Sequence, residues 1–554
     1  MLSKVTISQG QTVFNTQTND ALVSIYDSAE NLATELGQDS QISANLSTLG
    51  KADASAHKSL SFIPCSSAPG NRLILSPVGT LNNDCDDVRK IRNATRDGIS
   101  RAIKAGSRNP ILYLSNLNVG EQPFDADYSR WVEVAILAAF EVSYVTLVAR
   151  EWNHARNLDQ SANEKLDSIH IELSPSIQQN SDIQIILERA IAIEKGKRLY
   201  KDMGYGDPER MTPYKVAEYV EQTLSNIPGI TISVNKDLES IKKNYPLLYH
   251  SARASFDTEH TRPCIVELNY LSPDQGKVEE ELYLVGKGVT YDTGGISIKV
   301  GAGMRGMSRD KLGACAVAGF VYTAALLQSE RVNITGILTL ERNSVGPNCL
   351  LPDEVIPSRA GVRVHIVNTD AEGRLVMTDP LAECKERVLA QREVSNKLSR
   401  KLNQTVYTIA TLTGHVIRAY GGYGATVANG PARASQKDRK FAKSGTVYGD
   451  PFENSIMRQD DYDYIAAHTD REDVFQVGPH ASSATDRGHQ FPAAYMVVAA
   501  GLDKHGMAAE PDQRIDYIHL DIAGSAEEFG SEKGLGLPSI TGSPISVLVH
   551  AHLE

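Results

Sequence analysis

The segment "VNTDAEGRLVMTD" (367–379) places three charged side chains at alternate positions around a glycine: Asp370, Glu372 and Arg374. Upstream, "VRVHIV" (362–367) alternates polar and apolar residues and is rich in valine and isoleucine, a pattern that predicts a strand. Downstream, "LVMTDPLAECKERVLAQ" (375–391) has helical periodicity and a Thr-Asp-Pro start signal. The charged residues therefore fall in a strand-to-helix turn, where open α/β sheets collect their chemistry.

The first part of the chain has the rhythm of a parallel α/β sheet. Strands are predicted at 71–78 and 110–117, with a helix at 86–106 between them. A polar, turn-rich stretch follows at 173–182, and then a strongly periodic helix at 183–203 that would connect two domains. These patterns predict a smaller N-terminal α/β domain.

The second part alternates strands and helices to its end. A helix is predicted at 214–227, after the break "GYGDPERMTP". We expect a small-residue helix at 311–328 and a charged, solvated helix at 384–404. Strands are predicted at 230–234, 264–271, 280–289, 333–340, 362–367, 406–414 and 517–524.

The expected organisation is an N-terminal α/β domain (1–178), a linker helix (179–207) and a larger C-terminal domain (208–554). The larger domain would be a three-layer α/β/α structure with a mixed, mostly parallel sheet.

Composition narrows the class of protein. The chain has 554 residues and a net charge of -12, which argues against a nucleic-acid partner. Its six cysteines form no C-x-x-C pair, and the first residues show no signal or transit pattern, so we expect a reduced, cytoplasmic protein. The apolar stretch 131–149 contains Glu133 and Glu141, so we predict a buried helix that runs into a strand and no membrane span.

A second informative stretch is "ELYLVGKGVTYDTGGISIK" (281–299), in which Lys287 stands between two glycines and Asp292 and Lys299 follow. A phosphate-binding loop would need a glycine where Glu281 stands, and the dinucleotide fingerprint fails at Tyr291. Both nucleotide-binding hypotheses are therefore rejected.

Each acidic residue alone has an ordinary structural explanation. Asp310 could cap the helix that follows it, Asp370 and Glu372 could satisfy a turn, and Asp292 could form an Asx-turn before Gly-Gly. Likewise, a lone lysine is usually a solvated charge and a lone arginine a salt-bridge partner.

Together, these acids favour a metal site. Four carboxylates at the strand ends would repel one another and raise their own pKa values unless cations neutralised them. Two divalent ions would balance that charge, and oxygen-rich ligation with one amine suits zinc, manganese or magnesium. A lysine ligand must be neutral, and two nearby dications would lower its pKa accordingly.

Four segments resemble the signature segments of the leucyl (cytosol) aminopeptidase family of dimetal exopeptidases: "VGKGVTYDTGGISIK", "MSRDKLGACAV", "NTDAEGRL" and "ATLTG". The octapeptide "NTDAEGRL" is complete and highly specific. The resemblance extends over most of residues 182–550, because "YIHLDIAG" also resembles the family's last core strand. The first 170 residues share only the α/β rhythm.

The resemblance implies metal ligation by Lys287, Asp292, Asp310, Asp370 and Glu372. In the family, a hydroxide bridging the two metals attacks the first peptide carbonyl. Lys299 matches the residue that stabilises the developing charge, and Arg374 matches the residue that holds a bicarbonate ion as general base. These two positions are the expected catalytic residues.

The resemblance also implies a substrate side-chain pocket formed by Met307, Thr411, Gly414, Ala523 and Ala526. Such a pocket suits leucine-like residues, and Ala526 stands where some relatives carry methionine, so we expect a roomier pocket and broad specificity. Among the histidines, His415 and His519 are interpreted as ordinary turn or buried residues, because none forms a metal-ligand pair.

The sequence thus predicts a metallo-aminopeptidase that acts on peptides and, by resemblance, assembles as a homohexamer. The insertion near 384–404 could alter subunit contacts. Two alternatives remain open: a structural paralogue with little activity, and a nucleic-acid-binding role like that of some bacterial relatives, which the acidic charge disfavours.

Overall fold

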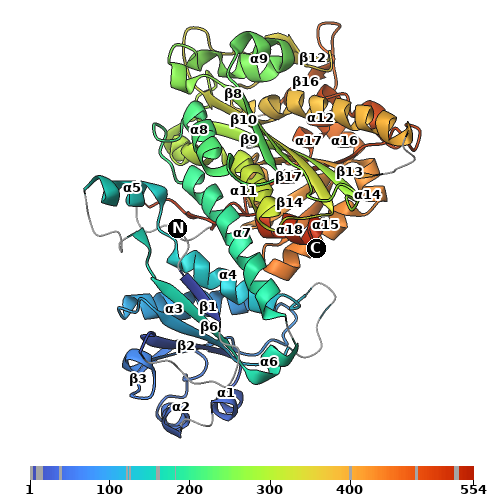
Figure 1. The fold of residues 1–554 in the computed structure, drawn as a ribbon. Helices are drawn as coiled ribbons and strands as arrows, with labels where there is room; N and C mark the ends of the chain where they lie inside the picture. Colours follow the sequence, from blue (N-terminus) through green and yellow to red (C-terminus); the bar gives the residue numbers. More distant parts are fainter. Residues whose placement is uncertain are drawn as a thin grey trace. The chain divides into compact units, whose positions relative to one another are not determined.

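The structure is a computed structural model that describes residues 4–7, 17–36, 40–119, 123, 126–156, 163–180, 182–397, 402–480, 485–528 and 536–554. The chain divides into two compact units (Figure 1). Unit 1 comprises Met1–Glu194 and Thr446–Gly449, and unit 2 comprises Lys195–Gly445 and Asp450–Glu554. The predicted fold class, α/β with mixed sheets, is confirmed.

Unit 1 is built on a six-stranded sheet in the order β1-β6-β5-β2-β4-β3. All neighbouring pairs are parallel except β3 with β4. The strands are β1 (Lys4–Ile7), β2 (Ala21–Tyr26), β3 (Ser61–Pro64), β4 (Arg72–Pro77), β5 (Pro110–Leu114) and β6 (Ser168–Leu173). The predicted β4, α3 (Arg89–Lys104) and β5 are present, with the unpredicted β2 between the two strands.

Two predictions in unit 1 were wrong. The stretch 131–149 does not run into a strand: α4 (Trp131–Ser143) is followed by α5 (Leu147–Ala155), and Thr146 caps α5 by accepting a hydrogen bond from Ala149 N. By length and composition, Trp131–Ala155 could cross a membrane, but 67% of its most apolar window is buried, as in a core helix. The supposed turn at 173–182 contains α6 (Pro175–Asn180).

The other helices that begin in unit 1 are α1 (Ala29–Glu35), α2 (Ser40–Ala52) and α7 (Ile183–Gly204). The predicted periodic helix at 183–203 corresponds to α7, which continues into unit 2.

Unit 2 contains an eight-stranded sheet in the order β15-β14-β17-β13-β9-β10-β8-β7. The adjacent strands β17, β13, β9 and β10 are mutually parallel, so their carboxyl ends lie along one edge. The strands are β7 (Ile230–Asn235), β8 (Cys264–Tyr270), β9 (Glu280–Asp292), β10 (Val332–Asn343), β13 (Asn403–Ala410), β14 (Gly424–Ala428), β15 (Phe452–Ile456) and β17 (Asp516–Asp521).

Helices α11 (Leu312–Leu326) and α12 (Glu372–Lys397) cover opposite faces of this sheet (Figure 1). A Cβ on Gly286 of β9 would lie 2.6 Å from the Ala314 Cα of α11, so only glycine permits this approach. The next residue, Lys287, points to the other face, where a Cβ on Gly373 of α12 would lie 2.6 Å from the lysine Cε. The sheet is therefore the middle of three layers.

The apolar core on the α12 side joins this helix to the sheet and to α17 (Phe491–Ala499). It includes Val285 and Val289 of β9 and Leu375 and Val376 of α12, all fully buried. The core thus fixes the helix start that carries the acidic residues.

The remaining elements from residue 195 onward are α8 (Pro213–Leu224), α9 (Leu238–Asn244), α10 (Pro246–Ser251), β11 (Val355–Pro357), β12 (Arg363–His365), α13 (Gly414–Tyr420), α14 (Gly430–Ala434), α15 (Lys437–Tyr448), α16 (Gln459–Asp463), β16 (Val474–Phe475), β18 (Glu527–Glu528), β19 (Ser539–Ile540) and α18 (Ile545–His552). Short 3-10 turns occur among them, including η6 (Met307–Arg309).

Three boundaries differ from the predictions. Strand β9 continues beyond the predicted end at Val289 to Asp292, because it pairs with β10 along its length. Helix α12 starts at Glu372, and the supposed start signal lies inside it, with Asp379 accepting hydrogen bonds from the backbone of Leu247 and Arg359. The predicted helix at 384–404 belongs to α12 as far as Lys397, residues 398–401 lie outside the described part, and the prediction was wrong for Asn403 and Gln404, which belong to β13.

Candidate metal centre

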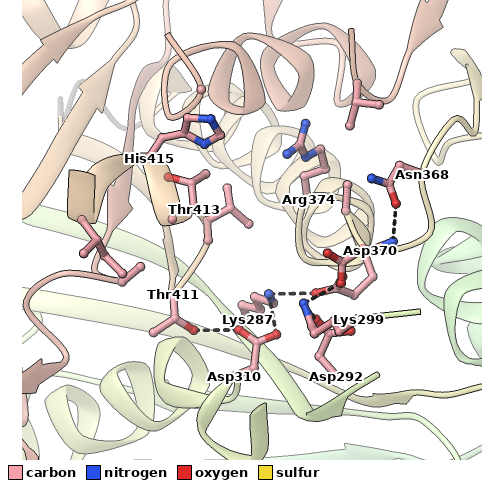
Figure 2. A pocket seen from close by; sticks show the side chains of 18 of the residues that line it. Lys287, Asp292, Lys299, Asp310, Asn368, Asp370, Arg374, Thr411, Thr413 and His415 are labelled. Carbon is pink, nitrogen blue, oxygen red and sulfur yellow. Dashed lines mark hydrogen bonds and ion pairs between the residues drawn. The ribbon is translucent and has the colours of Figure 1, made fainter. Parts of the chain in front are cut away.

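A cavity of ≈ 370 Å³ lies at the carboxyl ends of β9, β13 and β17, beside the start of α12 (Figure 2). All seven residues expected to bind metal or act in catalysis line it: Lys287, Asp292, Lys299, Asp310, Asp370, Glu372 and Arg374. This edge of a parallel sheet is the usual place for a ligand site.

Two lysines each lie between two carboxylates. Lys287 Nζ is 2.7 Å from Asp310 Oδ2 and 2.8 Å from Glu372 Oε1. Lys299 Nζ is 2.7 Å from Asp292 Oδ2 and 2.5 Å from Asp370 Oδ1. Residues from three separate segments of the chain therefore converge on one cluster.

Further contacts hold these acids in place. Asn343 Nδ2 and the backbone N–H of Gly294 both donate to Asp292 Oδ1, each at 2.8 Å. The second bond is the Asx-turn that the sequence allowed. Asp310 does not cap α11: its Oδ1 accepts from Thr411 Oγ1 at 2.9 Å, and Lys311 occupies the cap position.

Burial and like charge dominate the electrostatics. Burial, followed by the Asp292 carboxylate, raises the pKa of Glu372 to about 8. Burial also raises the pKa of Asp310, and burial with Asp292 raises that of Asp370. Desolvation alone would lower the pKa of Lys287, but Asp310 and Glu372 outweigh it and raise the pKa above its usual range. The cluster therefore contains more carboxyl groups than its two lysines can keep ionised.

These residues fit divalent metal ions. One oxygen from each of Asp292, Asp310 and Glu372 lies within 4.8 Å of the others, and all three side chains are buried. Glu372 Oε2 is buried and has no hydrogen-bond partner among the described residues, although such an oxygen normally has one. Carboxylate oxygens with one amine form a donor set for hard or borderline divalent cations.

Arg374 lies on α12 and lines the same cavity (Figure 2). Its Nη1 donates to the backbone carbonyl of Gln476 at 3.0 Å, and its guanidinium carbon is 4.9 Å from the centre of the Phe491 ring. Burial lowers the pKa of Arg374 to about 10, so the side chain is a cation near neutral pH.

The expected side-chain pocket is only partly as the sequence implied. Met307, Thr411, Gly414 and Ala523 line the cavity, whereas Ala526 is fully buried and is not among the described lining residues. The idea that Ala526 enlarges the pocket has therefore lost its basis.

Sequence reasoning missed several residues of the cavity wall. They include Arg309, Glu527, His415 and His480. Arg309 directly precedes the predicted ligand Asp310, and Glu527 directly follows the predicted pocket residue Ala526. Their positions next to predicted site residues could have indicated that they line the cavity. His415 follows the "TLTG" turn as described, but it also borders the cavity.

Comparison with known sequences agrees with this geometry. The model of the cytosol aminopeptidase family, catalytic domain, matches residues 198–549. A putative aminopeptidase, W07G4.4, of Caenorhabditis elegans is 34% identical over 520 residues, which span 93% of this chain and 92% of the relative. A probable cytosol aminopeptidase of Burkholderia multivorans is 26% identical over 90% of this chain and 87% of its own.

Solved structures share the fold. The apo leucyl aminopeptidase of Trypanosoma cruzi superposes with a TM-score of 0.74 at 17% identity, covering 99% of this chain and 96% of its own. The bottromycin maturation enzyme BotP, in complex with Mn, gives a TM-score of 0.71 at 17% identity, covering 96% and 98% of the two chains. The resemblance seen in the sequence is confirmed, and the chain belongs to the cytosol aminopeptidase family of metal-dependent hydrolases.

Proposed function

We propose that this chain is an active aminopeptidase that removes the first residue of peptides with the help of two divalent metal ions. The observation that carries the proposal is the cluster in which four carboxyl groups, three of them buried, are paired with two lysines. Such an excess of acids is unfavourable unless further cations share the cavity. The residues that would hold the ions are Lys287, Asp292, Asp310, Asp370 and Glu372.

Two bound divalent ions would supply a water of lowered pKa and polarise the scissile carbonyl. Lys287 would have to lose its proton to become a ligand, so cation binding would release a proton from a side chain whose pKa is raised. Zn²⁺ and Mn²⁺ suit the donor set, with Mg²⁺ as an alternative.

Lys299 is the proposed electrostatic catalyst. Its side chain is 16% exposed, whereas that of Lys287 is 4% exposed, so Lys299 lies nearer the open part of the cavity. Desolvation opposes its charge, but the carboxylates of Asp292 and Glu372 raise its pKa, so it stays an ammonium group. It would donate to the oxygen that gains negative charge when the peptide carbonyl is attacked.

Arg374 is the proposed anchor for an anion such as bicarbonate, which would accept the proton of the attacking water. A buried guanidinium with a planar array of donors suits a planar, bidentate anion. The amino end of the peptide would be held by the metal-binding cluster, which explains the restriction to first residues. Homohexameric assembly and a cytoplasmic location stay predictions.

The test combines metal analysis with hydrolysis of leucine amide by wild type and Glu372→Ala. We expect about two ions per wild-type chain and hydrolysis by the loaded enzyme, with metal content reduced and activity lost in the variant. Glu386→Ala is the control, because Glu386 lies on the same helix with a 46% exposed side chain paired with Arg359. A metal-loaded wild type without hydrolysis would overturn the proposal and leave the inactive-paralogue alternative.

A further inference from the structure

An ion pair in the cavity wall plays no part in the proposed mechanism. Arg309 Nε lies 2.8 Å from Glu527 Oε1, and both residues line the cavity. The side chain of Glu527 is 19% exposed and that of Arg309 only 7%, so the carboxylate is the more accessible partner. The cavity wall therefore contains this charged pair as well as apolar residues such as Met307 and Ala523.

Contacts with β18 and β19 hold the pair in place. Glu527 lies on β18, which pairs with β19, so that Glu527 is opposite Ile540. Arg309 Nη1 donates to the backbone carbonyl of Pro538, just before β19, at 2.7 Å. The backbone N–H of Ile540 in turn donates to Tyr205 Oη at 2.8 Å. The two strands thus fix the carboxylate in the cavity wall.

Exposure distinguishes the two ends of the cavity. At one end of the cavity, Thr411 donates to Asp310, whose side chain is only 8% exposed. At the other end, Asn368 lies beside Asp370, whose side chain is 34% exposed (Figure 2). Because the remainder of a peptide needs an open exit, it would leave past Asp370. The closed end near Asp310 then receives the side chain of the first residue, and Arg309 directly precedes Asp310 in the chain.

The chemistry of this closed end discriminates among side chains. An apolar group that covered Glu527 would remove water from a carboxylate without replacing the lost hydrogen bonds. An acidic group would meet the repulsion of Glu527 and would compete with it for Arg309. A cationic group would share the Glu527 carboxylate with Arg309 through a charge-assisted hydrogen bond, because this carboxylate is the more accessible partner, and its aliphatic stem could pack against apolar residues of the wall such as Met307.

We propose that the enzyme prefers peptides whose first residue is arginine or lysine, and that Glu527 accepts the hydrogen bond of the basic group. The inference rests on the proposed aminopeptidase function and gives it a substrate class. It replaces the leucine-like preference that the apolar residues of the pocket implied.

The test compares kcat/KM of the Mn²⁺-loaded full-length enzyme for the amides of arginine, lysine, leucine and glutamate. We expect the basic amides to exceed leucine amide by about tenfold or more, as for a hydrogen bond between charged groups. Glu527→Gln should reduce the rate constants for arginine and lysine at least about tenfold and change that for leucine by less than about threefold. Glu528→Gln is the matched control, on the same strand and not among the described lining residues.

The results distinguish failure of the proposed substrate class from failure of the proposed aminopeptidase function. Equal or better hydrolysis of leucine or glutamate amide would overturn the substrate class but leave the aminopeptidase intact, whereas no hydrolysis of any amide would refute the proposed function itself. Arg-Leu and Leu-Arg dipeptides place the basic group in the first or the second position, and a gain only for Leu-Arg would overturn the assignment of the closed end. The wild-type profile needs no variant, so poor folding of Glu527→Gln does not remove the test.

Discussion

Replacing Glu372 by glutamine should stabilise the metal-free protein while removing its response to metal. Burial and the neighbouring Asp292 raise the pKa of Glu372 from 4.5 to about 8. Between these values the folded state holds a proton that the unfolded state has released, so the stability of the wild type falls as pH rises. The slope is about 1.4 kcal/mol per pH unit for this group.

The magnitude follows from the pH interval. Relative to a pH below 4.5, the ionisation of this group lowers the unfolding free energy of the wild type by about 3 kcal/mol at pH 7 and by about 5 kcal/mol at pH 8 and above. Glutamine has nearly the same shape and no charge, so the variant escapes this loss. In a chelator its melting temperature should therefore exceed that of the wild type, and the difference should grow from pH 5 to pH 8.

Metal should remove most of this difference near pH 7. An ion at one hundred times its dissociation constant stabilises the wild type by about 2.7 kcal/mol, whereas the variant lacks one of the proposed ligands. Glu341→Gln is the control, because Glu341 is another fully buried acid with a raised pKa but is not among the described lining residues. It should raise the melting temperature in chelator and keep the metal response.

The measurement is thermal unfolding from pH 5 to pH 9, with chelator and with Mn²⁺. The electrostatic reasoning would be refuted if Glu372→Gln melted below the wild type in chelator at pH 8. A full metal response in this variant would refute its assignment as a ligand.

Three further perturbations test other parts of the site. Lys299→Met should lower kcat by about 10²- to 10³-fold in rate assays while metal content is unchanged, and loss of metal would contradict its catalytic role. Asn343→Ala removes the donor to Asp292, so metal affinity measured by calorimetric titration should fall about 10- to 100-fold, and an unchanged affinity would be evidence against this support. Gly286→Ala forces a Cβ to 2.6 Å from Ala314 Cα, and chemical unfolding should show a loss of about 1 to 3 kcal/mol; wild-type stability would show that α11 can move away.

Much of the sheet could be predicted because its strands and helices carry regular patterns. Alternation or apolar runs indicated β8, β10 and β17, and Thr-Pro indicated the start of α8. The end of β9 at Asp292, three residues beyond the predicted Val289, could not be predicted, since Gly286 and Gly288 weaken the strand on their own and leave its end undefined. Pairing with β10 and β13 on both sides overrides that weakness.

Other elements could not be predicted because their sequences show no clear strand or helix pattern. The segment of β15, "FENSI", has neither alternation nor a continuous apolar run, and it is a strand because it pairs with β14. Similarly, Pro380 suggested a helix start, but inside α12 it removes a single backbone donor and the surrounding core keeps the helix intact.

The acidic cluster itself could be predicted because a compact motif carries Asp370 and Glu372. The charged wall of the cavity could not, since Arg309 and Glu527 are far apart in the sequence and come together only when the chain folds. A pattern confined to one segment cannot report such a pair.

The lysine-carboxylate cluster has a consequence for how the enzyme is made. Lys287 and Lys299 each join two acids that would otherwise force the sheet edge and α12 apart. The two ammonium groups act as resident counter-ions, so we expect a newly synthesised chain to complete its core before it meets any metal. Biosynthesis and activation would then be separate events, and a cell short of the metal would accumulate a folded, dormant pool that is ready for loading.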